Sequence, residues 1–147
     1  MRIQLRDVIS FAGRDAIVEG VVTYHLAGKT WSLARAVDGD VVMWVEAPRE
    51  ESQDRQLVLH EIRDLEVTVP PPESIVYHKL SYVQRLAVRA TVEIAGDVPE
   101  RAAGTAEIWR YRGAGDLYVQ IEDTGGRVLM LAGESVHRGM IDILPGR

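Results

Sequence analysis

The chain has 147 residues, of which 46% are hydrophobic and 27% are charged, and its formal net charge is −5. This composition is typical of a globular protein, and the length suits one domain over residues 1–147. An acidic chain without a basic stripe makes a poor nucleic-acid binder, because phosphate neutralisation supplies most of the non-specific affinity. We therefore expect no nucleic-acid partner.

The absence of cysteine excludes disulfides, thiolate metal sites and thiol catalysis. The first residues carry no apolar run of the length found in signal peptides. No stretch reaches the roughly 18 consecutive apolar residues of a transmembrane helix. We expect a cytoplasmic protein without membrane insertion.

Strand patterns dominate the first part of the chain. Residues 16–25 are rich in β-branched side chains, residues 30–36 alternate between two faces, and residues 41–45 are continuously apolar. Asp38-Gly39 predicts a tight hairpin before the apolar run, because glycine adopts the positive φ that such turns need. Residues 56–65 fit either a strand or a short helix.

Three prolines, Pro70–Pro72, mark the obvious internal boundary. They supply no backbone N–H, so no central strand can pass through them, and we interpret them as a linker. Strand patterns resume after the linker, with a glycine-rich turn expected over residues 113–116. The further strands are expected over residues 82–94, 106–112, 117–121, 128–131 and 140–144.

The two sides of the linker resemble each other. The matched positions are 16–19, Trp31 and Glu46 on one side, and 90–93, Trp109 and Glu122 on the other. We therefore predict two pseudo-repeated antiparallel halves, residues 7–69 and 74–145. Many short strands with closely spaced turn signals are typical of a sandwich or barrel. The predicted fold is mostly β, with about ten strands in a sandwich or a partly closed barrel.

Several short motifs carry a family resemblance. They are Gly20, Trp31, the strand ends Val45-Glu46 and Ile121-Glu122, and the closing Gly133-Glu134-Ser135-Val136. With these motifs the chain resembles the bacterial family called domain of unknown function 4178. The resemblance implies a mostly β domain without an established activity, and accessory proteins linked to membrane-stress functions. It supplies no catalytic residues.

No catalytic or metal-binding signature accompanies these motifs. The histidines His25, His60, His78 and His137 show neither the strand spacing nor the helix spacing of metal ligands, so no metal site is expected. Ser135 follows Gly133-Glu134 as in a nucleophile elbow, but His137 replaces the closing glycine and no helix is predicted after it. We expect no catalytic residue and no cofactor.

Carboxylates gather where strands are expected to end. Glu46, Glu122 and Glu134 could in principle form acid–base pairs. Charges at strand ends more often keep edges and turns solvated. We interpret these three residues as solvated charges.

Aromatic residues give the strongest binding candidates. Trp31 and Trp109 occupy matched positions, so they either stack in the core or line a groove, and Trp and Tyr are enriched in binding hot spots. The candidate ligand- or partner-binding residues are Trp31, Trp109, Tyr111 and Glu122.

Two functional hypotheses follow. The first is a non-catalytic module that binds an unidentified protein partner, through these residues or an exposed edge strand, with a homodimer formed through such an edge. The alternative is a small-ligand-binding protein or enzyme with a pocket between the two halves. The residues of that pocket would be Trp31, Trp109, His60, His78 and Glu122.

Overall fold

The computed structural model describes residues 2–47 and 53–146, and this part of the chain forms eleven strands and one short 3-10 helix. The strands are β1 (Val8–Phe11), β2 (Arg14–Leu26), β3 (Lys29–Asp38), β4 (Val41–Glu46), β5 (Arg55–Glu61), β6 (Ser74–Tyr77), β7 (Leu80–Gly96), β8 (Gly104–Arg112), β9 (Leu117–Thr124), β10 (Arg127–His137) and β11 (Asp142–Leu144). The 3-10 helix, η1 (Arg138–Met140), precedes β11.

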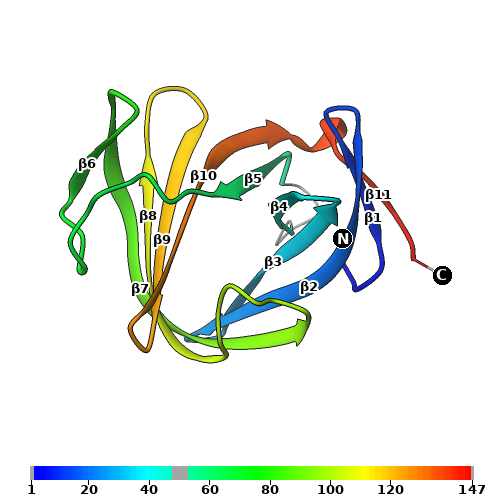
Figure 1. The fold of residues 1–147 in the computed structure, drawn as a ribbon, viewed down its shortest axis with the longest axis horizontal. Helices are drawn as coiled ribbons and strands as arrows, with labels where there is room; N and C mark the ends of the chain where they lie inside the picture. The colour runs from blue at the N-terminus through cyan, green and yellow to red at the C-terminus, as the bar shows by residue number, and fades with distance from the viewer. Residues whose placement is uncertain (1, 48–52, 147) are drawn as a thin grey trace.

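Eight of these strands close into an antiparallel barrel (Figure 1). The strand order is β11-β1-β2-β3-β4-β5-β10-β9-β8-β7-β6, and β2 also pairs with β7. The barrel therefore consists of β2 to β5 and β7 to β10, while β1, β11 and β6 continue the sheet beyond it. The predicted mostly β fold is confirmed, and of the two predicted forms the structure shows the barrel, which the pairing of β2 with β7 closes.

The ambiguous segment 56–65 lies mainly in a strand. β5 ends at Glu61, and residues 62–73, which include Pro70–Pro72, contain no helix or strand. The hairpins predicted at Asp38-Gly39 and at residues 113–116 are both present, between β3 and β4 and between β8 and β9. Local turn chemistry therefore predicted these connections correctly.

Three hydrophobic cores follow from the alternation of side chains across the barrel wall. Inward-facing residues such as Leu33, Trp44 and Ile108 fill the barrel. A second core lies outside the wall beneath β1 and includes Ile9. The third includes Tyr82 and residues of the segment after β5. Each fully buried large side chain of this kind contributes about 1.5–3 kcal/mol.

The two matched tryptophans point to opposite faces of the barrel wall. Leu33 lies opposite Glu46, whereas Ile108 lies opposite Glu122. Trp31 precedes Leu33 by two residues and faces inward, but Trp109 follows Ile108 by one and belongs to the third core. Because side chains alternate along a strand, an offset of two keeps a residue on the same face, and an offset of one moves it to the other face. The two tryptophans therefore do not stack on each other and do not occupy equivalent positions.

Glycines permit close approach where the first five strands meet the next five. Gly20 and Gly96 are partners where β2 pairs with β7, and a Cβ on Gly20 would overlap the carbonyl oxygen of Asp97. A Cβ on Gly133 would overlap the carbonyl oxygen of Val58 where β10 pairs with β5. Both seams of the barrel thus depend on residues without a side chain.

Candidate functional site

A buried ion pair occupies one end of the barrel. The loop of residues 97–103 connects β7 to β8 and places Arg101 against Glu122 of β9, with side chains only 2% and 1% exposed. Arg101 Nη1 also donates to Tyr24 Oη at 2.8 Å, and Nη2 donates to Thr124 Oγ1 at 3.3 Å. The interpretation of Glu122 as a solvated charge is wrong, because its strand position faces the barrel interior.

Hydrogen bonds continue from this pair along the barrel interior. Tyr24 Oη donates to Glu122 Oε2 at 2.7 Å, and Gln120 Nε2 donates to the same oxygen at 2.6 Å. Arg110 Nε in turn donates to Gln120 Oε1 at 2.8 Å. Burial raises the pKa of the Tyr24 hydroxyl to about 12, which keeps it a proton donor. The interior is thus a packed network and not an open ligand chamber.

A second ion pair marks the opposite end of the barrel. Arg110 Nη2 lies 3.0 Å from Glu46 Oε1, and these side chains are 15% and 8% exposed. Glu46 is therefore also largely buried, and its interpretation as a solvated charge is wrong. Two hollows, of about 280 and 370 Å³, both include this pair in their walls. A hollow of about 350 Å³ also lies at the Arg101 end, beside Pro99 and Glu100, but its lining includes neither Arg101 nor Glu122. The Arg110 pair is therefore open to a hollow, whereas the Arg101 pair is closed off from one.

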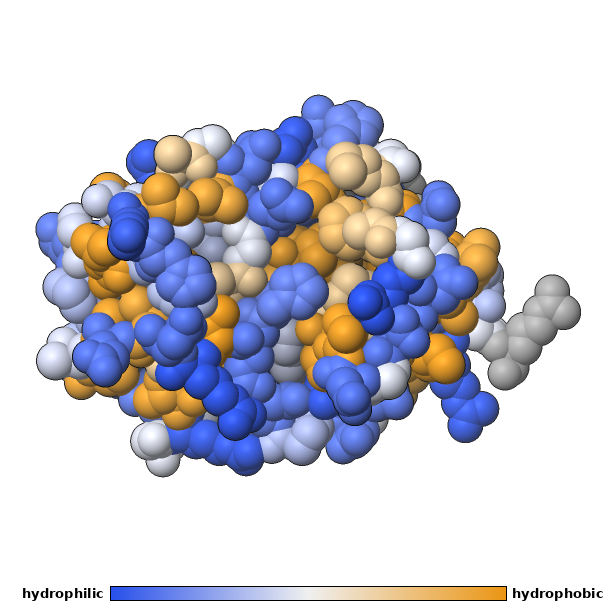
Figure 2. All heavy atoms as spheres, turned by 45° about the horizontal axis from the view of Figure 1, so that its top comes forward, coloured by the Kyte–Doolittle hydropathy of each residue, from blue (hydrophilic) through white to orange (hydrophobic). Residues whose placement is uncertain are grey.

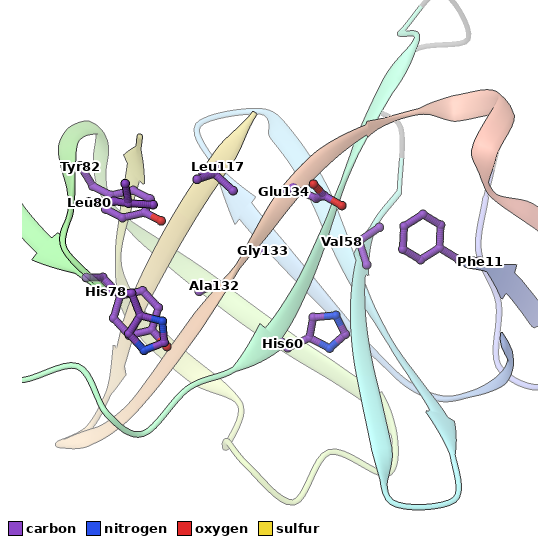
Figure 3. A pocket seen from close by; sticks show the side chains of 11 residues that line it. Phe11, Val58, His60, His78, Leu80, Tyr82, Leu117, Ala132, Gly133 and Glu134 are labelled. Carbon is purple, nitrogen blue, oxygen red and sulfur yellow. The ribbon is translucent and has the colours of Figure 1, made fainter. Parts of the chain in front are cut away.

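An outer groove of about 340 Å³ crosses β5 and β10 (Figure 3). Its floor includes Val58, Ala132 and Gly133. Phe11, from the tip of the β1–β2 hairpin, lies on one side, and Leu80, from the β6–β7 hairpin, lies on the other (Figure 3). The lining is mainly apolar, so the groove suits hydrophobic side chains.

A small polar cluster supports the β6–β7 rim of the groove. His78 Nε2 lies 2.7 Å from Asp64 Oδ2, Tyr77 Oη donates to Asp64 Oδ1 at 2.8 Å, and the Tyr77 and His78 rings stack at 4.0 Å. The hydrogen bonds from His78 and Tyr77 lower the pKa of the Asp64 carboxyl. Burial, followed by the bond to Asp64, raises the pKa of Tyr77 to about 12. The hairpin tip is thereby tied to the chain that follows β5.

The four predicted binding residues are all buried, in two different cores. Trp31 and Glu122 face the barrel interior, and Trp31 stacks on Tyr24 at 5.1 Å. Trp109 and Tyr111 belong to the third core, where Tyr111 Oη donates to the Pro72 carbonyl oxygen at 2.7 Å. The structure does not bring the four together, and their part in binding stays a prediction.

The predicted pocket histidines lie on the groove and not beside Glu122. His60 and His78 line opposite sides of the groove (Figure 3). Across residues 2–47 and 53–146, no group of three potential ligands is placed to hold a metal ion. Ser135 Oγ accepts a hydrogen bond from Arg55 Nε at 2.8 Å, and β10 continues past it as a strand.

The sequence patterns did not predict Arg101 and Arg110, the cations of the ion pairs at the two barrel ends. Arg101 lies in a loop without a regular pattern, so only the three-dimensional fold pairs it with Glu122. Arg110 alternates with Trp109 and Tyr111 in β8, and this alternation could have placed it inward. The described residues include no helix of the length and hydrophobicity required to cross a bilayer.

The fold and its sites define a closed eight-stranded antiparallel barrel with a filled interior and flanking hairpins. Residues 4–138 match the family model described as domain of unknown function (DUF4178). The chain therefore belongs to this family, as the resemblance predicted. Neither the curated proteins nor the solved structures yielded a match.

The motifs behind the resemblance have structural roles in this barrel. Gly20 and Gly133 lie at the two seams, where a side chain would not fit. Glu46 and Glu122 form the two interior ion pairs. The recognisable residues thus close and fill the barrel.

Proposed function

We propose that the protein is a non-catalytic accessory module that holds a protein partner in the outer groove. The observation that carries this proposal is the apolar floor of the groove between two projecting hairpins. Hydrophobic residues occur in patches among hydrophilic ones on the face shown in Figure 2. An apolar centre with a polar rim is the usual anatomy of a protein interface.

The groove would form only the centre of such an interface. A stable interface buries roughly 1,200–2,000 Å² in total and involves about 20–30 residues on each side, whereas eleven described residues line this hollow. A few anchoring side chains in a central pocket usually supply most of the binding energy. We infer that one or two hydrophobic side chains of the partner enter the groove, while His60, His78 and Glu134 contact its polar surroundings.

Free sheet edges offer a second route for association. In the described sheet, β6 and β11 are the outermost strands, and Val76 of β6 is 64% exposed. An unpaired edge can add a strand from another chain, including a second copy of this one. A homodimer through β6 is therefore the competing arrangement that the experiment must separate from groove binding.

The two-half organisation belongs to the same proposal. We infer that residues 7–69 and 74–145 are related halves of one domain, because β1 to β5 and β6 to β10 occur in the same order on either side of the β5–β10 seam. The groove lies across that seam, so both halves would contact the partner. The cytoplasmic setting and the link to membrane-stress functions rest on composition and on the family resemblance.

Capture of partners by charge variants of the tagged full-length chain tests the groove. Leu80→Glu places a charge at the groove, whereas Val83→Glu changes an exposed residue on the same strand outside the groove lining. We expect Leu80→Glu to lose a set of proteins that the wild type and Val83→Glu both retain. Loss with Val76→Glu alone would favour the edge strand, and equal capture by all variants would refute groove binding.

A further inference from the structure

The open end of the barrel contains a hollow with apolar walls from both groups of strands. Its volume is about 370 Å³. Leu26 and Trp31 come from β2 and β3, and Leu86 and Val88 come from β7. The hollow shares no lining residue with the outer groove, so it is a separate site.

Among the described lining residues of this hollow, positive charges outnumber negative ones. Lys29, Arg85 and Arg110 line it together with one carboxylate, Glu46. Arg110 already pairs with Glu46 at 3.0 Å, whereas Lys29 and Arg85 take part in none of the ion pairs between described residues. Within the described part of the chain, two cations without an ion-pair partner therefore border this mainly apolar hollow, in a protein whose net charge is −5.

A β-bulge explains why Arg85 joins this lining. Gln84 pairs with Tyr111 and Leu86 pairs with Arg110, so Arg85 is an extra residue without a partner on β8. Regular alternation would place Arg85 and Leu86 on opposite faces, but both line the hollow. Bulges re-aim side chains in this way and occur frequently beside functional sites.

Trp31 forms a rigid wall of the same hollow. Its ring stacks on Tyr24 at 5.1 Å with an interplanar angle of 11°, and Tyr24 is itself held by Glu122 and Arg101. The aromatic surface is therefore fixed before a ligand arrives. A preorganised wall reduces the entropy that binding must offset.

We propose that this hollow binds a small amphipathic anion, with its carboxylate or phosphate head at Lys29 and Arg85 and its apolar body against Trp31. The volume lies near the lower end of the range for ligand pockets, which suits a small molecule. The guanidinium group can donate two parallel hydrogen bonds to either type of head. This site is distinct from the proposed partner groove. It gives a definite location to the alternative hypothesis, a ligand pocket between the two halves.

Titration calorimetry of the full chain with octanoate, octyl phosphate and octanol tests the proposal, at concentrations below micelle formation. We expect saturable binding of at least one anion and much weaker binding of octanol. The double variant Lys29→Gln/Arg85→Gln should weaken anion binding by at least about tenfold, because it removes charge-assisted hydrogen bonds. Stronger binding of octanoate or of octyl phosphate identifies the head group.

A matched double variant controls for overall charge. Lys79→Gln/Arg89→Gln removes the same two residue types from positions outside the hollow and should bind like the wild type. In NMR spectra, the anion should shift the indole N–H signal of Trp31 and leave that of Trp109 unchanged. Absence of saturable anion binding, equal losses in both double variants, or octanol binding as strong as octanoate binding would overturn the proposal.

Discussion

The two ends of the barrel use the same ion-pair chemistry in different surroundings. At the closed end, Arg101 and Glu122 are 2% and 1% exposed and are joined by Tyr24. At the open end, Arg110 and Glu46 are 15% and 8% exposed and border two hollows. Breaking a pair deep in the interior leaves an unsolvated charge, whereas water reaches a pair at an opening. The closed-end pair is therefore expected to matter more for stability, and the proposed ligand site lies at the open end.

The largest effect is expected at the closed end. Arg101→Met should lower the free energy of unfolding by about 3–5 kcal/mol, because Glu122 is then left buried without its cation. Urea denaturation measures this change. Adding Glu122→Gln to Arg101→Met should recover part of the loss, and a double variant less stable than Arg101→Met would contradict the assigned pairing.

The seam between β5 and β10 should respond to an added methyl group. Gly133→Ala should destabilise the fold by about 1–3 kcal/mol, because the new Cβ would overlap the Val58 carbonyl oxygen. Thermal unfolding monitored by circular dichroism checks this. Glu134→Ala on the same strand is the control and should leave the stability nearly unchanged. Comparable losses of stability in both variants would contradict a special role of Gly133 at the seam.

The open-end pair should matter less than the closed-end pair. Arg110→Met should cost about 1–2 kcal/mol, since it removes one ion pair and one hydrogen bond to Gln120 in a partly solvated place. The same urea assay provides the measurement. A loss as large as that of Arg101→Met would abolish the contrast between the ends.

Alkaline pH should expose the contribution of Tyr24. Its pKa is about 12 in the fold against 10.0 for the ordinary side chain, so its contribution to stability is complete below pH 10 and is lost as the pH rises toward 12. Tyr24→Phe should flatten this part of the stability profile in urea titrations between pH 8 and pH 12. An unchanged slope would show that Tyr24 does not titrate at the closed end.

The smallest effect concerns the rim of the groove, outside both ends. The carboxyl of Asp64 should titrate below its usual range, because hydrogen bonds from His78 and Tyr77 favour the charged form. Any stabilisation from these bonds is present above the ordinary carboxyl pKa and is lost as the pH falls through the lowered value. His78→Asn should move the titration upward in carboxyl NMR spectra, and no movement would contradict the cluster.

Local patterns predicted the strands and turns well but not their partners. Alternation and β-branching identified β2, β3 and β4, and glycine turns located two hairpins. Closure of the barrel depends on pairing between residues far apart in the chain, such as Val21 with Ala95, which no local pattern encodes. The match between Trp31 and Trp109 was misleading, because a shift of one position reverses the face of a strand.

The candidate sites were harder to predict for the same reason. Phe11 and Leu80 come from different hairpins, and only closure brings them to one groove. The role of Arg85 depends on a bulge, which adds a residue without leaving a glycine or proline as a signal. Glu122 was selected as a binding candidate and interpreted as a solvated charge, because its buried partner Arg101 became visible only in the folded chain.

The glycine seams have a consequence for how the chain folds. Each group of five strands is a meander whose neighbours are close in sequence, whereas both seams join residues separated by about half the chain. Pairings between residues far apart in the sequence form late, and they make folding slower. The chain loses the entropy of closing a long loop before the new contacts can stabilise it. Two meanders with unpaired edges should therefore exist transiently before the barrel closes, and any change that delays closure should promote aggregation during synthesis.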